Sequence, residues 1–317
     1  MPAAAWPAFD PVRGRTVIPA PAAGTGHWAG APSALHDGGR FYLAYRLRAP
    51  RPRRGYELRI AAGEDGERFT DRWSLRKEEL GSASLERACL VRADEGYRLY
   101  VSYVDAADAR WRVDVLEADR PDGFDARERR AAVTAALAGA EGVKDPKVLA
   151  AGGSWLMLAS VATAAAASEP APAIHASEDA FAVGAVRSAT GLAASDDGLS
   201  WRWEGIVLAP PPYGWDAYET RLTTVLRRDG GYLGIYDGIA RVEDNYEERA
   251  GLATSTDLRS WRRLTLDGPA LRSPHGTGSL RYVDAVEAGD ATFCYYECAR
   301  PDGAHDLRLS VVSATGS

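Results

Sequence analysis

The stretch Tyr97-Arg98-Leu99-Tyr100-Val101-Ser102-Tyr103 alternates side-chain types and is rich in aromatic and β-branched residues. This pattern is typical of a β-strand. The turn sequence Ala93-Asp94-Glu95-Gly96 precedes it, so the two together predict a β-hairpin. Similar strands follow similar turns at 40–46, 155–159, 232–236 and 292–296. Five hairpins of one design therefore recur along the chain.

The spacing of these hairpins predicts the fold. From Tyr42 the equivalent residues Leu99, Leu156, Leu233 and Phe293 follow at intervals of 57, 57, 77 and 60 residues, which is in the range of propeller repeats. An Ala/Pro/Ser-rich loop insertion at about 161–190 accounts for the long interval. Third strands are expected at 191–195 and 251–255. We expect an all-β fold, a single five-bladed β-propeller of mainly four-stranded antiparallel blades that spans residues 1–317 as one domain.

Composition limits the classes of function. The 317 residues are 46% hydrophobic and 26% charged with a net charge of −6, which predicts a folded soluble protein without a general affinity for nucleic acid or anionic membranes. No apolar run is long enough to span a membrane, and no secretory signal is visible, so we expect a cytoplasmic protein. The basic residues are almost all arginine, as is typical of a high-GC bacterial genome. The three cysteines are expected to be reduced thiols.

Blade topology predicts where a ligand binds. The first strand of each blade is expected to start at one end of the central channel, on the same face as the loops that join second and third strands. These starts are placed at 27–32, 85–88, 143–146, 218–221 and 275–278. The sequence therefore predicts a funnel lined by these residues.

Two of these starts carry a family resemblance. Val143-Lys144-Asp145-Pro146-Lys147-Val148 looks like the Arg-Asp-Pro-Lys-Val segment of family 32 glycosidases, and Tyr218-Glu219 lies where that family has its acid/base glutamate. The chain thus resembles the five-bladed propeller glycosidases of families 32, 43, 62 and 68. The resemblance implies that Glu219 is a general acid and that Asp145 supports the transition state.

The first blade departs from the family pattern. Trp28-Ala29-Gly30-Ala31-Pro32 places an alanine where the family has its catalytic aspartate. Glycoside hydrolysis normally uses two carboxyl groups, and each assisting group contributes about 10²–10⁴-fold. We therefore expect a non-standard arrangement in which Glu86 or a bound water or anion replaces the missing group.

Further channel residues are candidates for substrate binding, and they are Trp28, Arg87, Lys144, Tyr218, Arg221, Asp237 and His275. Arginines at 46, 48, 51, 53 and 54 lie on the first loop of this face; they fit either an anionic substrate group or a solvated surface. Asp145 and Glu219 also fit a structural role, in which they pair with Lys144 and Arg221.

The predicted function is a glycoside hydrolase-like enzyme acting on a small glycoside or sugar derivative that carries an anionic group. The alternative is a catalytically degenerate propeller that binds a sugar or anionic metabolite, or a non-hydrolytic enzyme of phosphorolysis, elimination or cyclisation. No cofactor or metal is expected, because the acidic run 237–248 lacks the ligand order of a calcium loop. The expected partner is a small molecule, with neither nucleic acid nor membrane, and the oligomeric state is left open.

Overall fold

All five predicted hairpins are present in the computed structural model, which describes residues 8–164 and 171–313. The first strands of the hairpins are β2 (Trp28–Asp37), β6 (Leu85–Ala93), β10 (Gly142–Ala151), β14 (Glu219–Arg228) and β18 (Leu280–Ala288). The second strands are β3 (Arg40–Ala49), β7 (Gly96–Val104), β11 (Ser154–Ala164), β15 (Gly231–Ile239) and β19 (Ala291–Ala299). The predicted second strands are confirmed, because alternating side chains and glycine turns act locally.

Each hairpin is extended outward by two more strands. The third strands are β4 (Arg54–Gly63), β8 (Trp111–Ala118), β12 (Val186–Ser195), β16 (Arg249–Ser255) and β20 (His305–Ser313). The outer strands are β5 (Thr70–Arg76), β9 (Arg130–Val133), β13 (Arg202–Leu208), β17 (Arg262–Arg263) and, beside β20, β1 (Arg15–Ile18). Within the described residues the antiparallel pairings thus form five sets of four strands, numbered here one to five from β2 onward.

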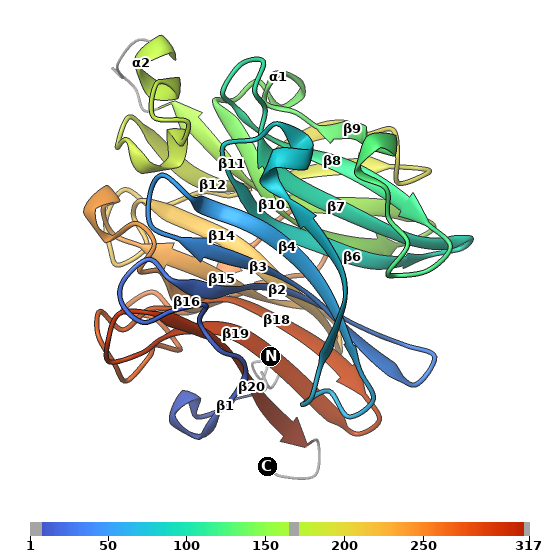
Figure 1. Ribbon diagram of the computed structural model, residues 1–317. Coiled ribbons are helices and arrows are strands. Elements are labelled where there is room, and N and C mark those ends of the chain that lie inside the picture. The colour runs from blue at the N-terminus through green and yellow to red at the C-terminus, as the bar shows by residue number, and fades with distance from the viewer. Residues whose placement is uncertain (1–7, 165–170, 314–317) are drawn as a thin grey trace.

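The hydrogen-bonded sheets are larger than these sets. One parallel pair, Trp28 with His305, joins the fifth set to the first, and another, Ser188 with Glu219, joins the third to the fourth. The described strands therefore count as three sheets. Strand β1 lies beside β20, as Figure 1 shows, so residues 15–18 complete the last set.

The first strands lie at the centre of the molecule. They contact one another in a closed ring, β2 with β6, β6 with β10, β10 with β14, β14 with β18 and β18 with β2. Apolar clusters fill the spaces between neighbouring sets; one joins Leu58 and Ile60 of β4 to Leu90 and Leu99 of the second set. Sheets packed face to face around a central ring of strands form a β-propeller.

Helices are few and short, and they are α1 (Ala135–Ala138), α2 (Ala171–His175), η1 (Pro11–Arg13), η2 (Lys77–Leu80), η3 (Ala126–Glu128), η4 (Ala180–Ala182) and η5 (Val242–Asp244). No helix in the described part of the chain is long and apolar enough to cross a membrane. The insertion predicted at 161–190 is shorter than expected, because β11 runs to Ala164 and β12 begins at Val186. Pairs such as Val161 with Ala189 continue the ladder through small residues.

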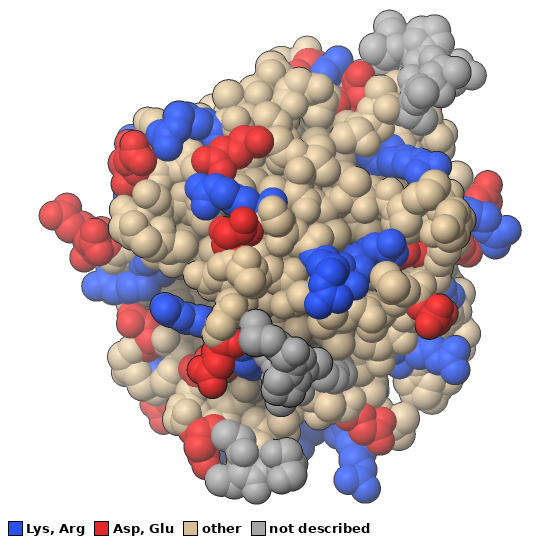
Figure 2. All heavy atoms as spheres, turned by 180° about the vertical axis from the view of Figure 1, so that it is seen from behind, with Lys and Arg blue, Asp and Glu red and all other residues tan. Residues whose placement is uncertain are grey.

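The face seen in Figure 2 carries acidic and basic side chains that are interspersed among uncharged atoms. Mixed surface charge of this kind favours solubility. The strongly charged residues that concern function are instead buried at the centre.

Candidate active site

A bulge recurs in every first strand, close to its beginning. The register shifts between Gly30 and Ser33, Leu85 and Ala88, Lys144 and Lys147, Leu222 and Thr224, and Arg281 and Asp284. Ala31, Asp145 and Tyr282, each the first residue of its bulge, have φ values of 51°, 57° and 53°. Bulges re-aim side chains, and left-handed backbone at non-glycine residues tends to mark functional positions.

Asp145 and Glu219 meet at one arginine. The Nη1 atom of Arg221 lies 3.2 Å from Asp145 Oδ2 and 3.3 Å from Glu219 Oε1. Both residues are buried: Asp145 is 0% exposed and Glu219 is 2% exposed. The backbone amide of Arg87 also donates to Asp145 Oδ1 at 3.2 Å. Two acids that are distant in the sequence therefore face a single site at the centre.

Glu219 is held in a way that favours its neutral form. Burial raises its pKa to about 7, with a further increase from the charge of Glu248 that the charge of Arg221 opposes. Its Oε1 atom has no hydrogen-bond partner. A buried carboxyl group that keeps a proton near neutral pH can donate it to a leaving group.

Glu86, in contrast, is held in its ionised form. Its carboxylate contacts Arg46 through both oxygens, and it accepts from Arg48 Nη1 at 3.0 Å and from the Tyr282 hydroxyl at 3.1 Å. Burial raises the pKa of Glu86, but the charges of Arg46, Lys144 and Arg48 outweigh burial and hold the pKa well below its usual range. Glu86 is therefore an ionised group saturated with donors.

Tyr282 connects the two halves of the site. Its hydroxyl lies 3.3 Å from Asp145 Oδ2 as well as 3.1 Å from Glu86 Oε2. The guanidinium of Arg221 lies 4.1 Å from the centre of its ring. The buried Tyr282 side chain thus contacts residues of three other first strands, β6, β10 and β14.

A second group of charges surrounds this centre. Arg281 pairs with Glu297 at 2.6 Å and with Glu248 at 2.5 Å, and His305 Nδ1 lies 2.9 Å from Glu297. Glu297 also contacts Arg46 Nη2 at 3.1 Å. Sequence reasoning did not single out Arg281, Tyr282, Glu248 or His305. The bulge position aligns Tyr282 with Asp145, but it is visible only in the strand pairing of the structure.

The predicted start of the last first strand was wrong. Strand β18 begins at Leu280, and His275 lies in an exposed turn before it, where its backbone amide donates to Ser273 Oγ at 3.1 Å. The sequence Pro-His-Gly-Thr-Gly has no alternation that would locate the strand. Arg281, and not His275, is the cation that the fifth set brings to the centre.

The other predicted binding residues are all buried. The Trp28 ring stacks on His305 at 4.8 Å, with the guanidinium of Arg281 4.7 Å from its centre. Asp237 accepts from Arg221 Nη2 at 2.8 Å. Of the remaining three, Tyr218 donates to the Phe181 carbonyl at 2.8 Å, Lys144 Nζ lies 3.9 Å from Asp145, and Arg87 Nη2 lies 3.3 Å from Asp284.

The loop arginines divide into two groups. Arg51 and Arg53 are exposed, as a solvated surface requires, whereas Arg46, Arg48 and Arg54 are buried at 0%, 6% and 2% exposure. The solvated reading was therefore wrong for these three. They belong to strands β3 and β4, and each contacts a buried carboxylate.

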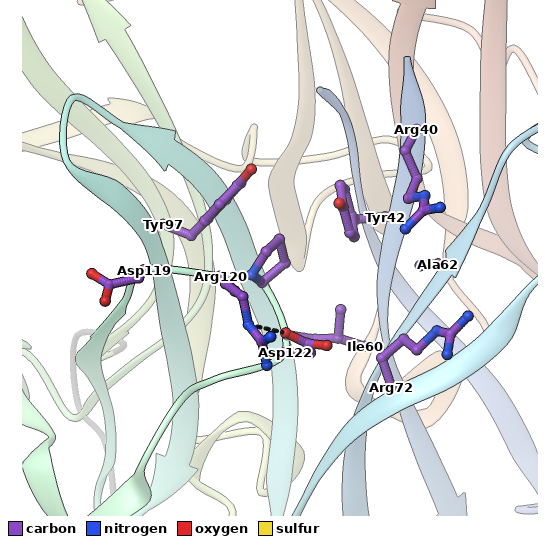
Figure 3. Close-up of a pocket in the computed structure, with 10 residues that line it drawn as sticks. Arg40, Tyr42, Ile60, Ala62, Arg72, Tyr97, Asp119, Arg120 and Asp122 are labelled. Atoms are coloured by element: carbon purple, nitrogen blue, oxygen red, sulfur yellow. Dashed lines mark ion pairs between the residues drawn. The ribbon is translucent and has the colours of Figure 1, made fainter. Parts of the chain in front are cut away.

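A cavity of about 400 Å³ lies away from this centre, between the first and second sets. Figure 3 shows Arg40, Tyr42 and Arg72 on one side and Tyr97, Asp119 and Arg120 on the other, with Arg120 paired to Asp122 at 3.2 Å. Strand β3 begins at this cavity with Arg40 and ends at the centre with Arg46 and Arg48. The cavity is thus at the opposite end of the strands from the carboxyl groups.

No protein-family model and no curated protein sequence matches the chain. Solved structures do. A thermostable family-43 glycoside hydrolase is 14% identical with a TM-score of 0.66, covering 93% of this chain and 92% of that one. A β-1,2-mannobiose phosphorylase from Listeria innocua is 14% identical with a TM-score of 0.63, covering 97% and 93%. An endo-arabinase from Bacteroides thetaiotaomicron is 11% identical with a TM-score of 0.64, covering 94% and 97%. The chain therefore has the propeller fold of glycoside-acting enzymes.

Proposed function

We propose that the protein is a glycoside-acting enzyme whose five sets of strands are five propeller blades in one domain, with its active site at the ring of first strands. The closed ring of contacts and the four-stranded pairing within each set support this count. Structural neighbours that act on glycosides support the class of reaction.

One observation carries the assignment. Glu219, whose pKa is raised to about 7, lies through Oε1 3.3 Å from the same arginine nitrogen that contacts Asp145, and this oxygen accepts no hydrogen bond. In this proposal Glu219 protonates the glycosidic oxygen as the leaving group departs. Asp145 orients the sugar and stabilises the positive charge that develops on it.

The third role is the non-standard part of the proposal. Ala31 has no carboxyl group, and Glu86 is ionised and accepts from Arg46, Arg48 and Tyr282. A carboxylate with such a low pKa is a weak base, so Glu86 suits charge stabilisation better than proton removal. Water or an inorganic anion would then attack the sugar. Inorganic phosphate is the second candidate, and the mannoside phosphorylases among the structural neighbours favour it.

An anionic group on the substrate is also part of the proposal, and Lys144 and Arg87 are its cationic partners. The contact of Lys144 with Asp145 is long, at 3.9 Å. Arg87 Nη2 lies 3.3 Å from Asp284, and Arg87 Nη1 has no hydrogen-bond partner. Arg46, Arg48, Arg221 and Arg281, in contrast, each lie within 3.2 Å of a carboxylate. A protein that binds such a sugar without turning it over is the alternative.

The test uses a panel of nitrophenyl glycosides and β-1,2-mannobiose, with and without inorganic phosphate. Glu219→Gln is expected to lower turnover at least 100-fold, which is the usual range for loss of a general acid. Glu57→Gln, which changes a buried glutamate paired with Arg59 in the first set, is the matched control and should keep activity. Full activity in Glu219→Gln would remove the assignment. Heat-stabilisation by sugars without any turnover would favour the binding protein.

A further inference from the structure

Residues 173–185, which we call the capping segment, lie between β11 and β12 at the end of the strands where the candidate site is found. Figure 1 shows α2, the start of this region, projecting beside the ends of β11 and β12. The segment packs on the propeller through Ile174 and Phe181, which are 2% and 1% exposed and share an apolar cluster with Trp111. It is therefore an ordered part of this face.

Asp179 holds the capping segment to three other sets of strands. It accepts from Tyr246 Oη at 2.6 Å and from Trp111 Nε1 at 3.2 Å, and Arg54 Nη2 lies 3.3 Å away. Asp179 is 1% exposed. A buried carboxylate with three donors from the first, second and fourth sets fixes the segment across the channel end.

The same contacts lead directly to the site. Tyr246 lies 4.5 Å from the Arg48 guanidinium, and Arg48 binds Glu86 at 3.0 Å. On the other side the Phe181 ring lies 4.5 Å from Lys144 Nζ. The Phe181 carbonyl also accepts from Tyr218, the residue before Glu219. The capping segment thus contacts the residues beside Asp145 and Glu219 directly, and it is linked to Glu86 through Tyr246 and Arg48.

The candidate catalytic acids are covered from both ends of the strands. Glu86, Asp145 and Glu219 are at most 2% exposed. From the opposite end the channel is filled by Arg87 and Asp284, both 0% exposed, with Lys147 bound to Asp284 at 2.5 Å. At the end that holds the candidate site, by contrast, the capping segment is part of the cover, and this segment is a connection between β11 and β12 and not a first strand.

We propose that the capping segment opens to admit a ligand and closes over it, so that the substrate is a glycoside small enough to be enclosed, of mono- or disaccharide size. A polysaccharide bound in the middle of its chain would extend out of the site on both sides, and the closed capping segment would block it. The substrate part of this inference rests on the proposed function. The opening itself does not.

Carboxyl labelling tests the opening without any assay of activity. The protein is treated with a carbodiimide and either glucosamine, an amine of monosaccharide size, or amino-dextran, and labelling of Glu219 is followed by mass spectrometry. Asp179→Asn removes the charge that binds Arg54 and is expected to speed glucosamine labelling at least tenfold. Tyr246→Phe removes only one hydrogen bond and should give a smaller increase in the same direction.

Asp216→Asn is the matched control. Asp216 is also 0% exposed and accepts from a tyrosine, Tyr236, at 2.7 Å and from Arg263 at 2.8 Å, but it does not contact the capping segment. It should label like the wild type. Equal labelling in the wild type, Asp179→Asn and Tyr246→Phe would overturn the proposal, and so would labelling of wild-type Glu219 by amino-dextran as fast as by glucosamine.

Turnover supplies the second arm. Wild-type protein is expected to act on β-1,2-mannobiose or nitrophenyl glycosides and to release nothing from the interior of arabinan or mannan. Cleavage inside a polysaccharide would overturn the size limit. If no glycoside is turned over, the proposed function fails, while the labelling result still decides whether the segment opens.

Discussion

Ala31, Asp145 and Tyr282 occupy matching bulge positions and share a left-handed backbone. Such a conformation costs about 1–3 kcal/mol for a non-glycine residue, and aspartate tolerates it better than alanine or tyrosine does. The backbone at residue 31 therefore suits an aspartate, although the side chain there is a methyl group.

Ala31→Asp should restore a carboxyl group where the resembled family has one. Because Asp145 adopts the same φ in its own strand, the backbone should accept the change. We expect hydrolysis of nitrophenyl glycosides to rise at least tenfold, measured against Ala31→Asn, which adds similar volume without charge. Equal rates in the two variants would show that a carboxyl group at position 31 does not supply the missing catalytic function.

The raised pKa of Glu219 predicts a pH dependence. In the folded protein Glu219 keeps its proton up to about pH 7, whereas in the unfolded chain it loses the proton near pH 4.5. The free energy of unfolding therefore falls as pH rises from 4.5 to 7. Glu219→Gln cannot ionise, so its melting temperature relative to the wild type should increase across the same window and then level off. A difference that stays constant from pH 4 to pH 8 would contradict this. Wild-type turnover should decline above pH 7.

At the scale of elements, the chain closes on itself through β1. Strand β1 covers the outer edge of β20, and Asp306 of β20 accepts from Thr16 Oγ1 at 3.1 Å and from the Ala20 amide at 2.8 Å. An uncovered strand edge is a template for association with other chains. Residues 15–18 are thus part of the last set of strands.

Deletion of residues 1–20 should expose this edge. We expect a lower melting temperature and concentration-dependent association, measured by calorimetry and light scattering. Deletion of residues 1–7, which leaves β1 intact, is the control and should behave like the full chain. A monomeric 21–317 protein of unchanged melting temperature would show that β1 contributes nothing.

At the scale of the whole molecule, a buried ion network replaces an apolar centre. Glu297 is 0% exposed, and it contacts Arg46, Arg281 and His305. Burial raises its pKa, but Arg281 and Arg46 outweigh burial and hold it well below the usual range. This carboxylate stabilises the fold above the pKa of the unfolded chain, and its contribution is lost as pH falls below about 4.5.

Glu297→Gln removes one charged partner from each of two buried arginines, Arg46 and Arg281, which keep Glu86 and Glu248 respectively. Loss of one member of a buried ion pair typically costs about 3–5 kcal/mol. Glu67→Gln removes an exposed partner of Arg15. It should lower the free energy of unfolding by about 0–1 kcal/mol. Urea unfolding at pH 7 measures both. Added salt should change the stability loss caused by Glu67→Gln and leave the loss caused by Glu297→Gln nearly unchanged, since buried pairs are screened little. Equal costs in the two variants would refute a stabilising network.

Much of the fold could be predicted from the sequence, because its signals are local. Alternation in 97–103 and the Gly-containing turn before it specify a hairpin without reference to the rest of the chain. Asp145 and Glu219 were singled out through the family resemblance, at the starts of recognisable strands. Arg281 and Tyr282 were missed because a loop without alternation precedes them, which moved the expected strand start to His275.

The sequence by itself determined the repeated hairpins, the class of fold and two of the acids brought to the centre. Only the tertiary structure decided which charges are buried together, how Glu219 keeps a raised pKa while Glu86 is held ionised, and that Asp179 joins Arg54, Trp111 and Tyr246. The reason is physical. Strand pairing depends on neighbours a few residues apart, whereas burial and charge depend on residues that five separate sets of strands bring to one point.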